Sequence, residues 1–210
     1  MLLFQNTEST TVVWPNGTPI FQTKCDKNVA NVDTNNQELK LKKKFKEAYM
    51  KTAKIFADLS HARRLHVGAI VVKDDRIISI GYNGMPAGWD NNCEDRVYDS
   101  GAGGWVSPEE FESMYPYTEW NEDAEEEYRY GLKTKPEVLH AESNAIAKLA
   151  KSNDSGNGAD IFITHAPCIE CAKLIYQSGI NSVYYGENYR DDSGIEFLKK
   201  SGVKIEQLDA

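Results

Sequence analysis

Apolar and polar positions follow two periods along the chain, and these periods predict its secondary structure. Residues 67–73 (VGAIVVK) and 76–82 (RIISIGY) are short, apolar and rich in β-branched side chains. The Asp74-Asp75 pair between them is typical of a hairpin turn, so we expect two antiparallel strands here. Residues 138–149 (VLHAESNAIAKL) instead repeat apolar side chains about every 3.6 residues, which predicts an amphipathic helix.

From residue 160 onward, predicted strands and helices alternate. Strands are expected in DIFIT, SVYY and VKIEQ, and helices in SGIEFLKKSG and in CIECAKLIYQSG, which ends at Gly179. Another helix is expected earlier, over about residues 37–60. Alternation of this kind predicts an α/β fold, with a partly parallel sheet, an antiparallel hairpin at its start and helices on its faces.

The remaining segments are less regular. Residues 1–35 are polar and aperiodic, which predicts an irregular arm, and NGMPAGWDNNCED after the hairpin predicts a loop. Ser107, Pro108 and Glu110 form a capping-box pattern that predicts a short helix. A second, acidic helix is expected over about Thr118–Tyr130.

Charge is distributed unevenly within one predicted domain. Residues 36–210 are expected to form a single domain with an acidic insertion at about 94–136. Between Glu94 and Tyr130, twelve acidic residues stand against two arginines, a balance of −10, whereas residues 37–64 carry nine basic and three acidic residues, or +6. The net charge of the whole chain is −8, which disfavours a broad nucleic-acid-binding face.

Length and hydropathy indicate one soluble unit. A chain of 210 residues with 40% hydrophobic content is long enough for one well-buried core. It contains no apolar run of about eighteen residues, and its N-terminus lacks the basic flank and apolar length of a signal peptide. We therefore expect a cytoplasmic protein without a membrane partner.

Four residues near two predicted helix starts indicate chemistry. His140 and Glu142 open one helix, and Cys168 and Cys171 open another as a Cys-x-x-Cys pair. Singly, such a pair can be redox-active, and a histidine at a helix start is more often structural. Together, one imidazole and two thiolates suit zinc, and three protein ligands leave a fourth position for water. A helix N-terminus also favours the thiolate form that binds metal.

These motifs resemble the signature of the zinc-dependent nucleoside and nucleotide deaminases, in which His140-Ala141-Glu142 is followed by Pro167-Cys168-Ile169-Glu170-Cys171. The stretches VGAIVVKDDRIISIGYNGMPAG and HAESNAI are similar to those of the deoxycytidylate deaminases, including phage-encoded members. The resemblance implies a three-layer α/β/α fold whose central mixed sheet has about five strands.

The resemblance also implies a reaction and its site. A zinc-bound hydroxide would attack the cytosine of dCMP while Glu142 carries the protons, giving ammonia and dUMP for thymidylate synthesis. Asn83 would bind the sugar hydroxyl, and Arg64, or Arg63 beside it, would bind the phosphate. The other substrate contacts that carry over are the backbone groups of Ala141 and Ala166 at the pyrimidine edge, and Tyr189, beside Arg190, closing over the nucleotide.

Regulation is implied only by the resemblance. Members of that family are commonly hexamers activated by dCTP and inhibited by dTTP, which implies a homohexamer, these two effectors, and Mg²⁺ beside the triphosphate. Gly84, Gly88 and Asn91, in a glycine-rich loop, are the candidate effector contacts.

Two alternatives stay open. One is a relative that acts on another amino base, such as a nucleoside, guanine or a tRNA adenosine, although the acidic balance argues against tRNA. The other is a zinc-stabilised binding module without catalysis, against which Glu142 argues.

Overall fold

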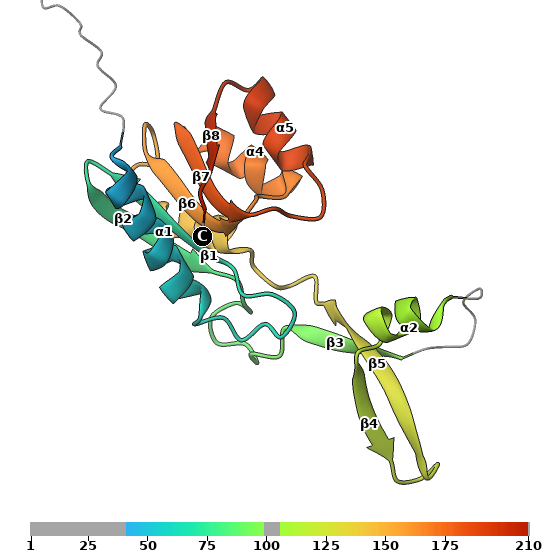
Figure 1. Ribbon diagram of the computed structural model, residues 1–210. Coiled ribbons are helices and arrows are strands. Elements are labelled where there is room, and N and C mark those ends of the chain that lie inside the picture. The colour runs from blue at the N-terminus through green and yellow to red at the C-terminus, as the bar shows by residue number, and fades with distance from the viewer. Residues whose placement is uncertain (1–40, 99–105, 210) are drawn as a thin grey trace, which may run out of the picture. The chain divides into compact units, whose positions relative to one another are not determined.

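A five-stranded mixed sheet forms the centre of the computed structural model, which describes residues 41–98 and 106–209 (Figure 1). Its strands are β1 (Gly68–Lys73), β2 (Arg76–Tyr82), β6 (Asp160–His165), β7 (Ser182–Glu187) and β8 (Lys204–Gln207), and its helices are α1 (Lys43–Ala57), α3 (Ala141–Leu149), α4 (Ile169–Gln177) and α5 (Ser193–Lys200). The strand order is β2-β1-β6-β7-β8. β1 pairs antiparallel with β2 and β6, whereas β6, β7 and β8 run parallel. The arm expected at 1–35 lies outside the described residues.

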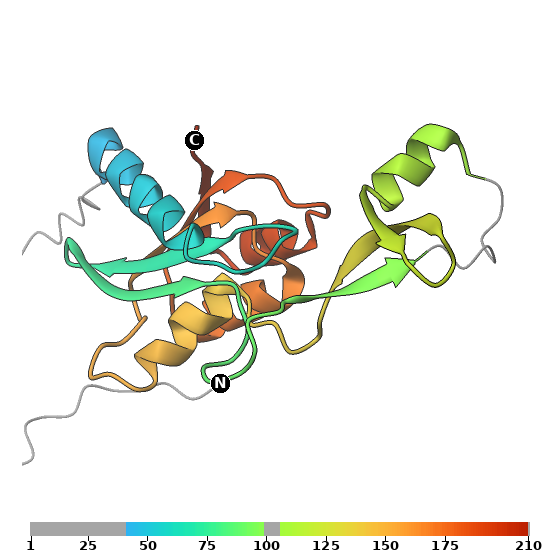
Figure 2. The same ribbon diagram turned by 90° about the horizontal axis from the view of Figure 1, so that it is seen from below.

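Alternate side chains of the strands pack against helices on the two faces of the sheet. On one face, Ile70 and Phe162 join α1 through Met50 and Ala53. On the other, strand side chains pack against α3, α4 and α5, and Figure 2 shows α1 and α3 on opposite sides of the sheet. The buried members of this second cluster include Ala69, Val71, Ile161, Ile163, Ala145, Ile175 and Leu198. The predicted three-layer α/β/α fold, with a five-stranded mixed sheet, is thereby confirmed.

Helix α1 ends earlier than its sequence pattern indicates. The helix expected to reach residue 60 ends at Ala57, because the next residues close a tighter turn in which the Ser60 N–H donates to the Ala57 carbonyl at 2.9 Å. The start expected near residue 37 lies outside the described residues. At 15 residues, α1 is the longest described helix. Within residues 41–98 and 106–209, no helix is both long and apolar enough to cross a membrane.

The hairpin of β1 and β2 has the turn that its sequence predicts. Asp74 and Asp75 have φ angles of 50° and 57°, the left-handed pair that a two-residue type I′ turn requires. Aspartate tolerates this region better than most side chains, since its short carboxylate can bond locally. The turn thus sets the register in which Lys73 pairs with Arg76.

The acidic insertion forms a second, three-stranded sheet, and one expectation for it was wrong. Its elements are β3 (Glu94–Tyr98), α2 (Pro108–Met114), β4 (Tyr117–Asn121) and β5 (Glu126–Thr134), with strand order β3-β5-β4. Helix α2 has the predicted capping box. The acidic helix expected over Thr118–Tyr130 is instead the β4–β5 hairpin.

Local turn chemistry and aromatic packing explain this hairpin. The Asn121 side chain accepts N–H bonds from Asp123 and Ala124 at 2.9 and 3.0 Å, and Glu125 has a φ of 55°, so the chain reverses there. Across the strands, Tyr130 is buried under the rings of neighbouring tyrosines and the Arg96 guanidinium. These contacts outweigh the helix propensity of the glutamates.

The insertion begins and ends at adjacent points of the core. The Lys135 N–H donates to the Cys93 carbonyl at 3.0 Å, so the chain leaves and returns through a hydrogen-bonded pair. Cys93 itself is buried with Ala62 and Val138. Next to it, the buried carboxylate of Glu94 accepts the N–H groups of Arg63 and Arg64.

Candidate active site

The N-termini of α3 and α4 bring three metal-ligand side chains together. His140 is the N-cap of α3, Cys168 is the N-cap of α4, and Cys171 lies in the first turn of α4. His140 Nδ1 lies 3.5 Å from Cys168 Sγ and 3.4 Å from Cys171 Sγ. All three ligand atoms lie within 4.8 Å of one another, and in the described chain no other group of three or more His, Cys, Asp and Glu residues does so.

Strand β2 fixes the position of α3. A methyl group on Gly81 would lie 2.1 Å from the Ala141 carbonyl oxygen, so only glycine lets the start of α3 approach the strand this closely. The Ser79 hydroxyl donates to the Ala145 carbonyl at 2.7 Å, and Asn144 Nδ2 donates to the Tyr82 carbonyl at 3.1 Å. The backbone around His140 is thereby held to the sheet.

The start of α4 is held from two other elements. Gly194, at the start of α5, packs so closely that an added methyl group would lie 2.0 Å from the Pro167 carbonyl oxygen. The Ala166 N–H donates to the Glu187 carbonyl at the end of β7 at 2.8 Å. Cys168 therefore follows a segment that is fixed by both β7 and α5.

The donor set and its spacing fit a zinc ion. Tetrahedral zinc with usual bond lengths separates an imidazole nitrogen from a thiolate sulfur by about 3.5 Å, close to both observed distances. Hydrogen bonds with Cys171 and His140 lower the pKa of Cys168, whereas the bond to Cys168 and burial raise the pKa of Cys171. One thiolate is thus favoured on Cys168 before metal binds, and a metal would deprotonate the second thiol.

Glu142 is a buried acid beside these ligands. It lies in the first turn of α3 and is 4% exposed. Burial raises its pKa to about 7, while its own backbone N–H and the charge of His140 act in the opposite direction. A carboxyl group with a pKa in this range can both accept and donate a proton near neutral pH.

Asn83 follows β2, and its side chain forms hydrogen bonds with the main chain of two residues in the loop before β1. Its Oδ1 accepts the Val67 N–H and its Nδ2 donates to the Leu65 carbonyl, both at 2.8 Å. An amide has two donor hydrogens and two acceptor lone pairs, so each atom retains capacity for one more partner. The loop before β1 is therefore held in place by the residue expected to bind the sugar.

The two arginines of the loop before β1 contact the insertion. Arg64 Nη1 donates to Thr134 Oγ1 at 3.1 Å, and the Arg63 guanidinium lies 5.0 Å from the centre of the Tyr117 ring. Tyr189 packs against the buried cluster of Ala166, Tyr185 and Ile195, and the Arg190 guanidinium lies 5.2 Å from its ring centre. The hydrogen bond with Cys168 raises the pKa of His140, whereas burial and the charge of Arg190 act in the opposite direction.

The glycine-rich loop is bonded directly to the chain before His140. Gly84 and Leu139 exchange two backbone hydrogen bonds of 3.1 and 2.9 Å. Gly88 has a φ of 87°, and the Asn91 carbonyl accepts a bond from Cys93 Sγ at 3.4 Å.

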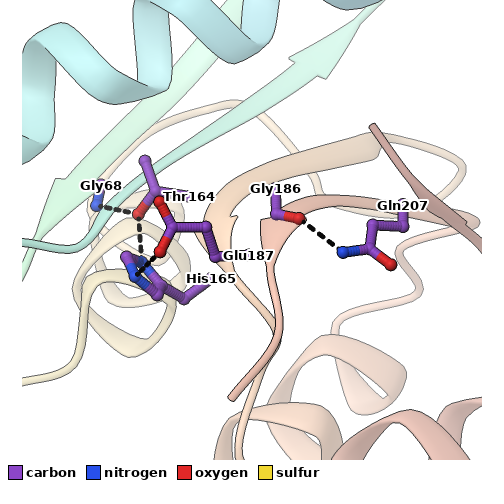
Figure 3. A network of polar contacts seen from close by, with 6 residues as sticks. All are labelled: Gly68, Thr164, His165, Gly186, Glu187 and Gln207. Carbon is purple, nitrogen blue, oxygen red and sulfur yellow. Dashed lines mark hydrogen bonds and ion pairs between the residues drawn. The ribbon is translucent and has the colours of Figure 1, made fainter. Parts of the chain in front are cut away.

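Sequence reasoning missed a polar network at the ends of β6 and β7. Figure 3 shows His165 between Thr164 and Glu187, with the Thr164 hydroxyl also bonded to the Gly68 N–H. The signal for it was the His165 side chain directly before the Ala-Pro-Cys segment, but Glu187 lies in another strand.

Comparison with known proteins gives a consistent result. Residues 43–187 match the model of the cytidine and deoxycytidylate deaminase zinc-binding region. ComE operon protein 2 of Bacillus subtilis is 32% identical over 162 residues, covering 77% of this chain and 69% of the relative. The deoxycytidylate deaminase of Enterobacteria phage T4 is 34% identical, covering 66% of this chain and 77% of the relative.

A solved structure is similar over its whole length. It is the dCMP deaminase of the cyanophage S-TIM5 in complex with dCMP and dUMP, with 39% identity, a TM-score of 0.61, and coverage of 80% of this chain and 99% of that chain. The family match spans β1, β2, β6 and β7 of the central sheet, α3, α4 and all three candidate metal ligands. This chain therefore belongs to the cytidine and deoxycytidylate deaminase family.

Proposed function

We propose that this protein hydrolyses dCMP to dUMP and ammonia. The observation that carries the proposal is the similarity to the cyanophage enzyme solved with dCMP and dUMP, which extends over nearly all of that chain. The His140, Cys168 and Cys171 cluster supports the same reading, because it fits the zinc ion of this family. The product dUMP is the precursor that thymidylate synthesis requires.

The chain's own residues supply the site for zinc. His140, Cys168 and Cys171 would hold the ion, leaving one tetrahedral position without a protein ligand. Zinc supplies Lewis acidity that lets a water molecule ionise near neutral pH. The two helix N-termini direct their N–H groups toward the thiolates and stabilise their negative charge.

Glu142 moves the protons of the reaction. Its carboxylate accepts a proton from the attacking water and delivers it to N3 of the pyrimidine. It then takes the proton of the hydroxyl now bonded to C4 and gives it to the departing amine, so that ammonia leaves as the C4 carbonyl forms. Burial supports this role, since a carboxyl with a pKa of about 7 exchanges protons readily in either direction. The closed surroundings of Glu142 also limit competition from bulk water.

Binding of the nucleotide is assigned by position and supported by the geometry. Asn83 retains hydrogen-bonding capacity for the sugar hydroxyl, and the backbone of Ala141 and Ala166 borders the ligand cluster. Arg64 would meet the phosphate, and Tyr189 would cover the nucleotide. Because Arg64 now bonds Thr134, phosphate binding requires its guanidinium to turn or to share that donor.

Regulation by dCTP and dTTP is proposed for the glycine-rich loop. A triphosphate, with Mg²⁺, would bind at Gly84, Gly88 and Asn91. The backbone pairing of Gly84 with Leu139 supports this, since a shift of the loop would move the residue that precedes His140. Unchanged dTTP binding after alteration of Gly88 and Asn91 would count against this site. The proposed homohexamer rests on family likeness alone.

One assay tests the central proposal. Purified protein is analysed for bound zinc and for ammonia release from dCMP, deoxycytidine, an adenine nucleotide and a guanine nucleotide. We expect one zinc per chain and release from dCMP only. Equal turnover of deoxycytidine and dCMP would remove the nucleotide assignment but keep the deaminase class, and activity on the purine compounds alone would remove both.

A further inference from the structure

A chain of hydrogen bonds crosses the sheet just before Cys168, and His165 lies at its centre (Figure 3). His165 Nδ1 lies 3.1 Å from Thr164 Oγ1, and His165 Nε2 lies 3.2 Å from a carboxylate oxygen of Glu187. The Gly68 N–H donates to the same Thr164 oxygen at 3.1 Å. The His165 side chain is only 13% exposed, although its partner Glu187 is 67% exposed. The network thus links β1, β6 and β7 through Thr164 and His165.

The partners match one form of the ring. An ionised Glu187 carboxylate can only accept, so it pairs with a proton on Nε2. The Thr164 oxygen accepts the Gly68 N–H, and its hydroxyl proton can be donated to Nδ1. The neutral Nε2–H tautomer therefore fits both contacts of the ring.

The same network fixes the next residue, Ala166. Its N–H donates to the Glu187 carbonyl, so the side chain and the main chain of Glu187 hold two consecutive residues. With the N–H committed, the group that Ala166 can offer a substrate is its carbonyl oxygen. On the far side of β7, Gln207 Nε2 donates to the Gly186 carbonyl at 2.9 Å and supports the strand end (Figure 3).

We propose that His165 is a positioning residue that, through Thr164 and Glu187, orients the Ala166 carbonyl toward the amino group of the substrate. This inference rests on the proposed deaminase function. A carbonyl in this orientation accepts a hydrogen bond from the amino group of dCMP. It would face the C4 carbonyl oxygen of dUMP instead, and two acceptor oxygens repel each other. His165 thereby favours substrate over product, a difference that a purely structural histidine would not produce.

Three variants separate the two contacts of the ring. His165→Leu removes both, His165→Asn keeps a polar atom near Thr164, and His165→Gln keeps one that reaches Glu187. We expect His165→Leu to raise KM for dCMP about tenfold, as is usual for residues that orient a site. The dUMP inhibition constant should not rise, because losing the orientation also removes the repulsion of dUMP. Bound zinc and the unfolding midpoint should stay parental, and Asn and Gln should give intermediate KM values. The matched control is His61→Leu at an exposed histidine, which should change none of these.

The outcomes are decisive in either direction. An unchanged KM in His165→Leu, or an equal rise in KM and in the dUMP constant, overturns the proposal, as does the Nδ1–H tautomer in a ¹⁵N–¹H correlation spectrum of the parent. Should His165→Leu fail to fold, the Asn and Gln variants are judged by the ratio of KM for dCMP to the dUMP inhibition constant. A parent that is inactive on dCMP overturns the proposed function itself. An active parent whose His165 variants keep the parental ratio of KM to the dUMP inhibition constant overturns only the role of His165.

Discussion

His140 and Cys168 occupy equivalent positions, each as the N-cap of a helix, and their Nδ1 and Sγ atoms lie 3.5 Å apart. Both residues have extended backbone angles, so their side chains lie at the helix ends rather than along the helix sides. Two helix N-termini therefore converge on one point, where their partial positive charges favour thiolates and where a metal would join α3 to α4.

Removal of zinc should affect both activity and stability. Treatment with a strong chelator is expected to abolish ammonia release and to lower the thermal unfolding midpoint, because the ion links two helices that otherwise repel at their N-termini. Adding Zn²⁺ should restore both, whereas Mg²⁺ should not, since thiolates are poor ligands for it. Calorimetry with metal analysis measures this, and an unchanged midpoint after complete removal would contradict the bridging role.

Glu142→Gln should stop catalysis without loss of bound zinc. Glutamine keeps the shape and hydrogen-bonding of the side chain but cannot carry protons, so kcat should fall by about 10³-fold. Bound zinc should stay at the parental level because the three ligands are untouched. The control is Glu196→Gln, an exposed acid on α5 paired with Lys200. A Glu142→Gln enzyme within tenfold of the parent would exclude the proton-carrying role.

Gly81→Ala should weaken the fold and the metal site together. The new methyl group would lie 2.1 Å from the Ala141 oxygen, so α3 must move, at a cost of about 1–3 kcal/mol of unfolding free energy. The shift should also lower zinc affinity, because His140 caps that helix. Gly202→Ala is the comparison, since its φ of 77° adds strain with no atom within 4 Å. Urea unfolding and zinc titration that show equal losses in both variants would refute the packing argument.

Asp160→Asn should remove a pH dependence of stability. Burial raises the pKa of Asp160 above its ordinary value of 3.8, partly offset by a hydrogen bond from Ser182 and the charge of Lys46. The folded state thus binds the proton more tightly than the unfolded chain, and stability declines as pH rises from 3.8 through the raised pKa. Asparagine keeps an acceptor for Ser182 but does not titrate. The unfolding midpoint of the variant should therefore change less with pH across this window than that of the parent, and it should be higher than the parental midpoint at neutral pH. A variant that is less stable at neutral pH would show that the carboxylate is net stabilising.

Elements with local signals were predicted correctly. The capping box of Ser107 and Glu110, the Asp74-Asp75 turn and the start of α3 at His140 each depend on neighbouring residues, so the sequence pattern is sufficient for them. The β4–β5 hairpin was mistaken for a helix because its glutamates favour helices, while Asn121 and the packing of Tyr130 decide the outcome.

Long-range relationships were beyond the sequence. The family signature correctly indicated that His140, Cys168 and Cys171 would meet, and the structure places them together. Nothing local shows that Glu187 lies beside His165, because parallel pairing of β6 and β7 creates that contact. The bonds of Arg64 to the insertion have the same origin, since Thr134 is seventy residues away.

The hydrogen-bonded pair of Cys93 and Lys135 has an evolutionary consequence. Since the two exits from the core are neighbours, the polypeptide between them can lengthen, shrink or be exchanged at little entropic expense to the sheet. Insertions and deletions within that region are therefore expected to leave the sheet and the three metal-ligand residues in place.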